Sequence, residues 1–219
     1  TLNGIHTWLL ARMFNPRVFE ELRTKQQLGY IVQLGFGENE GFLSLSCTVQ
    51  SEYPPEFVRG QVEKCLAEQF KWVQEQLTDA EFEQQRKGLT SILKEEPKSL
   101  SQEFGRYWNE VVLQRYDFNR REGQVKVLDE QVSLSSLRDF ASKLADQTLT
   151  PRLCVEVHST AADAPVKQAP SDAGLPLTPD RRWKGEEAVD DFRRSARWVQ
   201  MHEGKGASRF GKSEAVARL

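Results

Sequence analysis

The strongest constraint on the fold is a strict two-residue alternation over residues 42–50. Apolar side chains point one way and polar side chains point the other: Leu43, Leu45, Cys47 and Val49 against Ser44, Ser46, Thr48 and Gln50. This period is that of a β-strand with one buried face and one accessible face. The β-branched and aromatic run at residues 30–36 predicts a second strand, and residues 37–41 supply a turn. The two runs therefore predict an antiparallel hairpin.

Two helices are predicted before this hairpin. Apolar residues at helical spacing predict the first over residues 2–13. Asn15 followed by Pro16 is typical of a new helix start, with Asn15 as the N-cap and Pro16 in the first turn. The second helix is expected to end at Gly29.

More helices are predicted after the hairpin. One begins at about Pro55 and carries an apolar stripe. The next follows the capping box of Thr78 and Glu81 and ends before Pro97. A later helix begins at Ser133 or Ser135, either of which can act as the N-cap.

Ser101 is expected to cap another helix, which carries several large apolar side chains. They are Phe104, Tyr107, Trp108, Val111 and Val112. An aromatic pair can form a platform on which a base or a cofactor stacks. At this spacing in an amphipathic helix, however, the stripe predicts packing against the core.

The last regular element predicted is a strand at residues 152–158, with Leu153, Val155 and Val157 on one face. It is expected to pair with the sheet of the hairpin. The order of helix, hairpin, several helices and strand predicts an α+β domain, in which helices pack on one face of an antiparallel sheet.

Composition changes after about residue 160. Residues 1–160 are predicted to form the folded domain, and residues 161–185 a flexible linker rich in Ala, Pro, Asp and Lys. Residues 186–219 are predicted to be a flexible C-terminal tail with one short helix. Because Thr1 lies in an apolar helical pattern with neither Met nor signal peptide, we expect a fragment that is incomplete at its N-terminus.

Charge and cysteine content exclude several classes of partner. The 30 basic and 32 acidic residues give a net charge of -2, which predicts neither nucleic-acid nor membrane binding. No apolar run approaches the ~20 residues that a bilayer span needs.

The sequence has three cysteines without CxxC spacing. We expect them to be small buried hydrophobic residues and not disulfide partners or zinc ligands. They are consistent with a reducing, cytoplasmic setting.

No catalytic constellation is visible in the sequence. The three histidines, His6, His158 and His202, have no second ligand at helical spacing, so we expect no zinc site in this segment. There is also no Gly-x-Ser-x-Gly elbow, no phosphate-binding loop and no calcium loop. We therefore expect the segment alone to be inactive as an enzyme.

Arg23 and Tyr30 are the candidate functional residues. They flank a junction at which a helix gives way to a strand, so a cation and a phenol can point into the same space. Spacing alone favours an ordinary surface arginine and a half-buried strand tyrosine, because most such residues belong to the scaffold.

Residues 22–32, LRTKQQLGYIV, resemble a Leu-Arg-x-x-x-Gln-Leu-Gly-Tyr segment of a known peptidase family. This segment occurs in the C-terminal half of the insulin-degrading-enzyme branch of the pitrilysin-type (inverzincin) zinc peptidases. Further similar runs are SEYPP at 51–55, KEEPKSL at 94–100, YW at 107–108 and YDF at 116–118. The likeness covers about residues 1–160.

The resemblance implies a peptidase made of two bowl-shaped halves around a chamber. The zinc and its His-x-x-Glu-His helix would lie in an N-terminal half that is not in this sequence. This chain would supply part of the substrate-binding wall. By the resemblance, Arg23 and Tyr30 bind the substrate main chain, and the partners are a peptide substrate and the N-terminal catalytic half.

Two alternatives remain open. One is a structural or partner-binding relative that uses the same fold without peptidase activity, similar to the core-protein subunits. The other is a free, truncated product with no activity. The insulysin and nardilysin branches are not separated by this segment.

Overall fold

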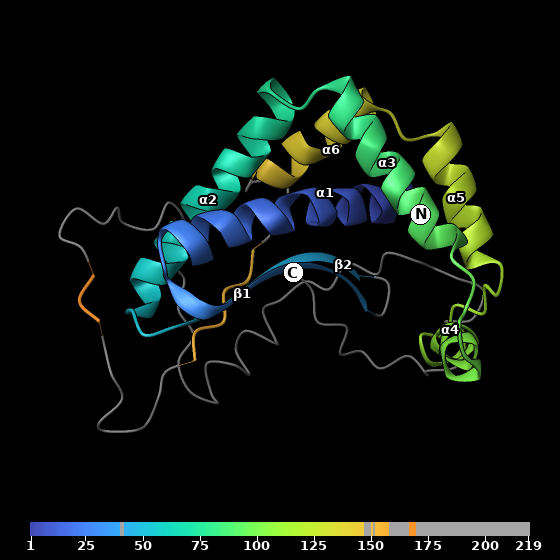
Figure 1. Ribbon diagram of the computed structural model, residues 1–219, viewed down its shortest axis with the longest axis horizontal. Coiled ribbons are helices and arrows are strands. Elements are labelled where there is room, and N and C mark those ends of the chain that lie inside the picture. Colours follow the sequence, from blue (N-terminus) through green and yellow to red (C-terminus); the bar gives the residue numbers. More distant parts are fainter. Residues whose placement is uncertain (40–41, 147–149, 151, 158–166, 170–219) are drawn as a thin grey trace, which may run out of the picture.

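In the computed structural model, a helix that extends over 24 residues lies across a two-stranded sheet. The structure describes residues 1–39, 42–146, 150, 152–157 and 167–169. The first elements are α1 (Leu2–Val18), η1 (Phe19–Lys25), β1 (Gly29–Asn39) and β2 (Phe42–Ser51). They are followed by α2 (Pro55–Glu75), α3 (Asp79–Lys94), α4 (Leu100–Val112), α5 (Arg120–Glu130) and α6 (Leu134–Ala145). Figure 1 shows α1 over the hairpin, with α2, α3 and α6 on the other side of α1.

The helix does not stop at Asn15, so the predicted break there is wrong. Helix α1 runs through Pro16 and continues directly as the π-helix η1. The buried stripe explains this continuity, because Phe14, Val18 and Leu22 are completely buried on either side of the exposed proline. Pro16 lacks the N–H that would bond to the carbonyl four residues earlier, and the wider π-type winding begins within one turn of it.

The predicted hairpin is confirmed. Strands β1 and β2 pair antiparallel, with Leu34 opposite Cys47 and Phe36 opposite Leu45. The alternation holds, because the apolar residues of β2 are partly buried and its polar residues are exposed. Strand β2 begins at Phe42 as predicted, whereas β1 continues past the predicted end at Phe36 to Asn39, so residues 37–39 of the predicted turn are strand.

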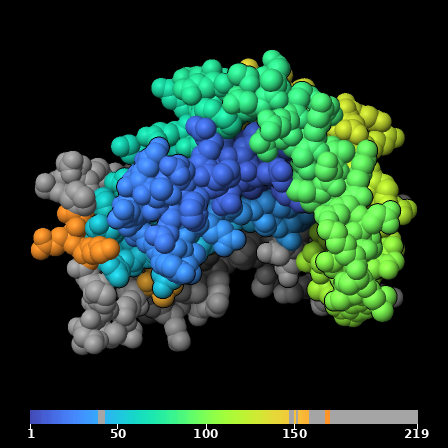
Figure 2. All heavy atoms as spheres, viewed as in Figure 1, coloured from blue at the N-terminus to red at the C-terminus, as the bar shows by residue number. Residues whose placement is uncertain are grey.

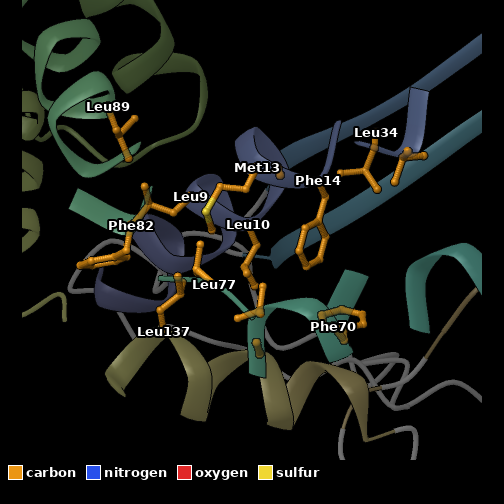
Figure 3. Packing of buried hydrophobic residues seen from close by; sticks show 14 of the residues in the cluster. Leu9, Leu10, Met13, Phe14, Leu34, Phe70, Leu77, Phe82, Leu89 and Leu137 are labelled. Carbon is orange, nitrogen blue, oxygen red and sulfur yellow. The ribbon is translucent and has the colours of Figure 1, made fainter. Parts of the chain in front are cut away.

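The core forms around α1. Buried side chains of α1 pack there against those of the sheet and of other helices. Figure 3 labels ten residues of this core: Leu9, Leu10, Met13, Phe14, Leu34, Phe70, Leu77, Phe82, Leu89 and Leu137. The rings of Phe14 and Phe70 meet edge to face at 5.3 Å. Burial of an aliphatic or aromatic side chain contributes about 1.5–3 kcal/mol. The predicted α+β class, with helices on one face of an antiparallel sheet, is thus confirmed.

Most predicted helix starts are confirmed. The Thr78–Glu81 capping box is present at α3, and α2 begins at Pro55. Ser133, rather than Ser135, caps α6. Helix α4 is capped by Ser99 instead of Ser101, because the Ser99 hydroxyl accepts the N–H of Gln102.

Helix α5 was not predicted at all. Its hydrophobic periodicity is weak, since Leu128 is its one buried residue. No helix among the described residues is both long and apolar enough to cross a membrane.

Helix α4 does not pack its apolar stripe against the core, so that prediction is wrong. The α4 face, which comprises Phe104, Tyr107, Trp108, Val111 and Val112, is exposed, with Phe104 59% and Trp108 51% accessible. The helix stands at one end of the molecule, next to the end of α5 (Figures 1 and 2). Glu110 is the buried residue of α4. Helix α4 is therefore amphipathic, as predicted, but its apolar face points to solvent.

The predicted last strand is also not formed in residues 152–157. They carry no strand pairing, and Leu153, Val155 and Val157 are 68%, 75% and 87% exposed. An alternating run becomes a strand only where a neighbour offers hydrogen bonds. Among the described residues the sheet contains β1 and β2 alone. His158, nearly all of the linker at 161–185 and the tail at 186–219 lie outside the described residues.

His6 gives the core a specific pH sensitivity. It is 3% exposed, its Nε2 lies 3.0 Å from the Ser136 hydroxyl, and its ring lies 5.1 Å from that of Phe140. Burial lowers the pKa of His6 from 6.5 to about 4.

We predict that His6 destabilises the fold as the pH falls from 6.5 towards 4. In this window the unfolded state binds a proton on His6 and the folded state does not, so stability is lost as pH falls. Between pH 7 and pH 5, urea unfolding of the wild type should lose about 2 kcal/mol more than that of His6→Gln. The two proteins should lose the same amount if His6 keeps its ordinary pKa in the folded chain.

Candidate functional site

The chain reverses between η1 and β1, and local contacts fix this junction. The N–H of Leu28 donates to the carbonyl of Leu22 at 2.9 Å. Gln27 adopts a left-handed backbone conformation, with φ of 51°. The helix therefore ends at Lys25, and the chain turns at Gln27. This turn comes two residues before Gly29, where the helix was predicted to end.

Gly29 does not end the helix, as was predicted, but allows β1 and β2 to approach each other closely. A Cβ atom at this position would lie 1.8 Å from the carbonyl oxygen of Gln50 on β2. Only glycine permits this close approach of two backbones. The Ser51 hydroxyl donates to the Leu28 carbonyl beside it, and the Tyr53 N–H donates to the Ser51 oxygen at 3.0 Å. The start of β1 is thus held tightly against the end of β2.

This junction brings the two predicted site residues together. The guanidinium carbon of Arg23, on η1, lies 5.3 Å from the ring centre of Tyr30, on β1. At this distance the cation and the ring attract each other. Tyr30 is 80% exposed, so its hydroxyl is open to solvent. In the described part of the chain, Arg23 has no carboxylate partner within ion-pair distance.

Arg23 and Tyr30 line a shallow hollow of about 450 Å³ between the helix and β1. Its other lining residues are Asn15, Phe19, Ile31, Val32 and Gln33. No acidic side chain is among them. Guanidinium and phenol groups donate hydrogen bonds, so the hollow offers donors to a carbonyl or to an oxyanion.

Asn15 has a role that the sequence did not reveal. Its side-chain oxygen accepts the backbone N–H of Leu34 on β1 at 2.9 Å. It was predicted as a helix N-cap, because Asn before Pro is typical of one. No sequence signal predicted its partner, which lies 19 residues further along the chain.

A network of ion pairs fixes α4 beside the far end of β1. Glu38 pairs with Arg120 and lies 3.5 Å from a guanidinium nitrogen of Arg115. Arg115 also pairs with the buried Glu110 at 2.5 and 2.9 Å. Because Glu110 is almost fully buried, removing its partner would leave an uncompensated charge. The position of the α4 face is thus set by charged groups rather than by apolar contacts.

The described residues do not fit a zinc site. Within residues 1–39, 42–146, 150, 152–157 and 167–169, no three His, Cys, Asp or Glu side chains are grouped to hold a metal. His6 faces Ser136 inside the core. Burial raises the pKa of Cys47 to about 11 and that of Cys65 to about 12, so neither thiol forms a thiolate readily. Neither Cys47 nor Cys65 is therefore an activated nucleophile.

Comparison with known sequences identifies the relatives of this chain. Residues 9–108 match the family model described as "PQQ synthase PqqF-like, C-terminal lobe domain 4". Human insulin-degrading enzyme is 32% identical over 137 residues, which are 63% of this chain and 13% of that protein. The Drosophila melanogaster enzyme of the same name is 29% identical over 150 residues, 68% of this chain and 15% of that protein. Human nardilysin is 35% identical over 123 residues.

The fold has a counterpart of known structure. The crystal structure of pitrilysin matches with a TM-score of 0.57 and 18% identity, over 64% of this chain and 15% of that one. The fold is therefore that of a pitrilysin-like α+β domain. The chain is a homologue of insulin-degrading enzymes and nardilysins, and its fold resembles that of pitrilysin. It spans 13% to 15% of the length of the first of these relatives.

We predict that Gly29→Ala destabilises the fold by about 2–3 kcal/mol, because the new methyl group overlaps the Gln50 carbonyl. The matched control is Gly105→Ala in α4, where a Cβ meets nothing within 4 Å. It should stabilise the chain by about 0.5–1 kcal/mol. Urea unfolding of the two variants measures both effects, and equal stabilities would refute the close contact at Gly29.

Proposed function

We propose that this chain is a non-catalytic, substrate-binding segment of a zinc-dependent endopeptidase. In this proposal Arg23 and Tyr30 bind the main chain of a peptide, while the zinc and its ligands are supplied by a separate, N-terminal half. The observation that carries the proposal is the juxtaposition of Arg23 and Tyr30 at the rim of an open hollow without acidic groups.

The chemistry of the two side chains supports this role. Arg23 carries a permanent positive charge with several N–H donors, and Tyr30 carries one O–H donor. Both suit a peptide carbonyl, and both suit the oxyanion that develops when a peptide bond is attacked. The cation–ring contact restricts their orientation before a substrate arrives, which reduces the ordering that binding requires.

The homology supports a peptidase context for the segment. Its relatives are insulin-degrading enzymes and nardilysins, whose chains are several times longer than the matched region. In this proposal the segment contributes to hydrolysis beside a partner that holds the zinc.

The first test is peptide hydrolysis by this chain mixed with a separately produced, zinc-loaded N-terminal half. Activity should appear only on mixing. Arg23→Ala and Tyr30→Phe should each lower kcat/KM on the order of 10²-fold, because each removes one donor. Unfolding midpoints should stay unchanged, since both side chains lie at the surface.

Lys71→Ala is the matched control, because it removes an exposed cation of α2 that does not line the hollow. Equal activity of all four proteins would show that Arg23 and Tyr30 belong to the scaffold. Complete absence of activity on mixing would favour the alternative, a structural relative of the peptidase fold.

The second part of the proposal is that the α4 face packs on the zinc-bearing half. Its aromatic residues include the stacked pair Phe104 and Trp108, whose ring centres are 5.6 Å apart. Exposed aromatic clusters of this kind mark protein–protein contacts. The ion pairs of Glu110 hold the helix in place, so the face is pre-arranged for a partner.

We predict that Trp108→Ala weakens association with the zinc-bearing half at least tenfold, because buried Trp residues dominate interface energies. It should shift the unfolding midpoint of the isolated chain by no more than about 2 °C, since half of the side chain is already exposed. Isothermal titration calorimetry measures the first quantity and thermal unfolding the second. A large loss of stability with unchanged association would place Trp108 in the core instead.

A further inference from the structure

A second hollow lies between α1, α3 and β1, separate from the candidate site. It measures about 750 Å³, a size typical of ligand-binding pockets. Asn15 lines both hollows and stands between them. No Asp or Glu lines the second hollow, and its main side chains are Trp8, Arg12 and Asn15 of α1, Gln85 of α3 and Phe36 of β1.

Helix α1 places an aromatic ring and a cation side by side in the second hollow. Trp8 and Arg12 are four residues apart, and Asn15 follows three residues later. Residues at these spacings lie on the same face of a helix. The ring of Trp8 stacks on that of Phe36, with 6.0 Å between their centres and 11° between their planes. The hollow therefore has an aromatic wall next to a positive charge.

Helix α3 holds the Arg12 side chain in place. The Nε of Arg12 donates to the Oε1 of Gln85 at 3.3 Å. Gly88 lies one turn further along α3, and a Cβ atom there would be 2.9 Å from a terminal nitrogen of Arg12. Glycine destabilises the interior of a helix relative to alanine. At position 88 it leaves the room that the guanidinium group occupies.

The side-chain groups that remain for a ligand in the second hollow are hydrogen-bond donors. The Gln85 oxygen is taken by Arg12, and the Asn15 oxygen accepts the N–H of Leu34. Within the described ranges, the terminal nitrogens of Arg12 and the amide nitrogens of Asn15 and Gln85 have no hydrogen-bond partner. Guanidinium and amide N–H groups suit a carboxylate, and an arginine can bind both carboxylate oxygens at once.

We propose that the second hollow binds the free carboxyl end of a peptide whose last residue is aromatic. The carboxylate accepts hydrogen bonds from Arg12 and Asn15, and the last side chain packs on Trp8 and Phe36. In a terminal residue, the carboxylate and the side chain branch from one carbon atom, as the cation and the ring of α1 lie side by side. The site goes beyond the proposed function, because it uses other residues and breaks no bond.

Four fluorescein-labelled peptides test the proposal by fluorescence anisotropy with the 219-residue chain. The first ends in Phe with a free carboxyl group, the second is its C-terminal amide, and the third ends in Gly with a free carboxyl group. The fourth is the amide with Glu placed before Phe. We expect the first to bind at least fivefold more tightly than each of the others, the size of one exposed charge pair.

Each of the other peptides can overturn one part of the proposal. Equal binding of the amide would overturn recognition of a carboxylate, and equal binding of the Gly-ended peptide would overturn the aromatic wall. Equal binding of the fourth peptide would assign the hollow to a side-chain carboxylate instead of a chain end.

Gly88→Ala separates recognition from stability, because the new methyl group takes the place of the Arg12 guanidinium. It should weaken binding of the Phe-ended acid at least fivefold without lowering the midpoint of urea unfolding, since alanine favours the helix. Gly105→Ala makes the same change in α4, where a Cβ meets nothing within 4 Å, and should leave the affinity unchanged. Equal affinities of the two variants would refute the site.

Arg12→Gln should weaken binding of the Phe-ended acid about fivefold, the size expected for one exposed charge pair. Lys71→Gln makes the same charge change on α2, outside the hollow, and should leave the affinity unchanged. Equal weakening by both would show diffuse attraction and refute the hollow as the site. Because no cleavage is measured, a failure of the mixing experiment with the zinc-bearing half would not alter this result.

Discussion

Burial of α1 is the constraint on which the rest of the structure depends. Ile5, Leu9, Leu10 and Phe14 have no exposed surface, because the sheet covers one side of the helix and other helices cover the remainder. A helix so enclosed cannot shift without opening the core, whose packing is dense. Since η1 continues α1 directly, the position of Arg23 is set by this packing. The packing of the core therefore fixes the position of the site.

Irregular backbone is concentrated between this rigid helix and the sheet. Pro16 interrupts the hydrogen bonds of the helix, η1 is wound more widely, Gln27 is left-handed and the pairing of β1 slips between Gly29 and Ile31. Each feature costs free energy, and such features cluster where function needs a particular geometry. Here they turn the chain so that Arg23 and Tyr30 face each other across 5.3 Å.

Local rules predicted much of the fold. The alternation of β2 and the capping box at Thr78 depend on neighbouring residues, and both are present in the structure. The failures came from contacts between distant segments. Asn15 was assigned to a cap although it binds Leu34, and the α4 stripe was assigned to the core although it faces outward. Periodicity reveals that a face is apolar, but it does not reveal what covers that face.

Only part of the candidate site could be predicted from the sequence. The spacing of Arg23 and Tyr30 allowed them to meet, and the structure brings them together. The second hollow, of about 750 Å³, could not be predicted, since it joins Arg12 of α1, Gln85 of α3 and Leu34–Phe36 of β1. Residues this far apart in sequence become neighbours only through helix packing.

The central claim is that Arg23 and Tyr30 face the substrate within an assembled peptidase. The most direct measurement is photo-crosslinking from benzoylphenylalanine at position 30 to a labelled peptide, with an inactivated zinc-bearing half present to prevent cleavage. The same probe at position 116, an exposed tyrosine beyond α4, is the control. The account predicts crosslinks to the peptide from position 30 and not from position 116. Equal labelling from both positions, or none from position 30, would contradict it.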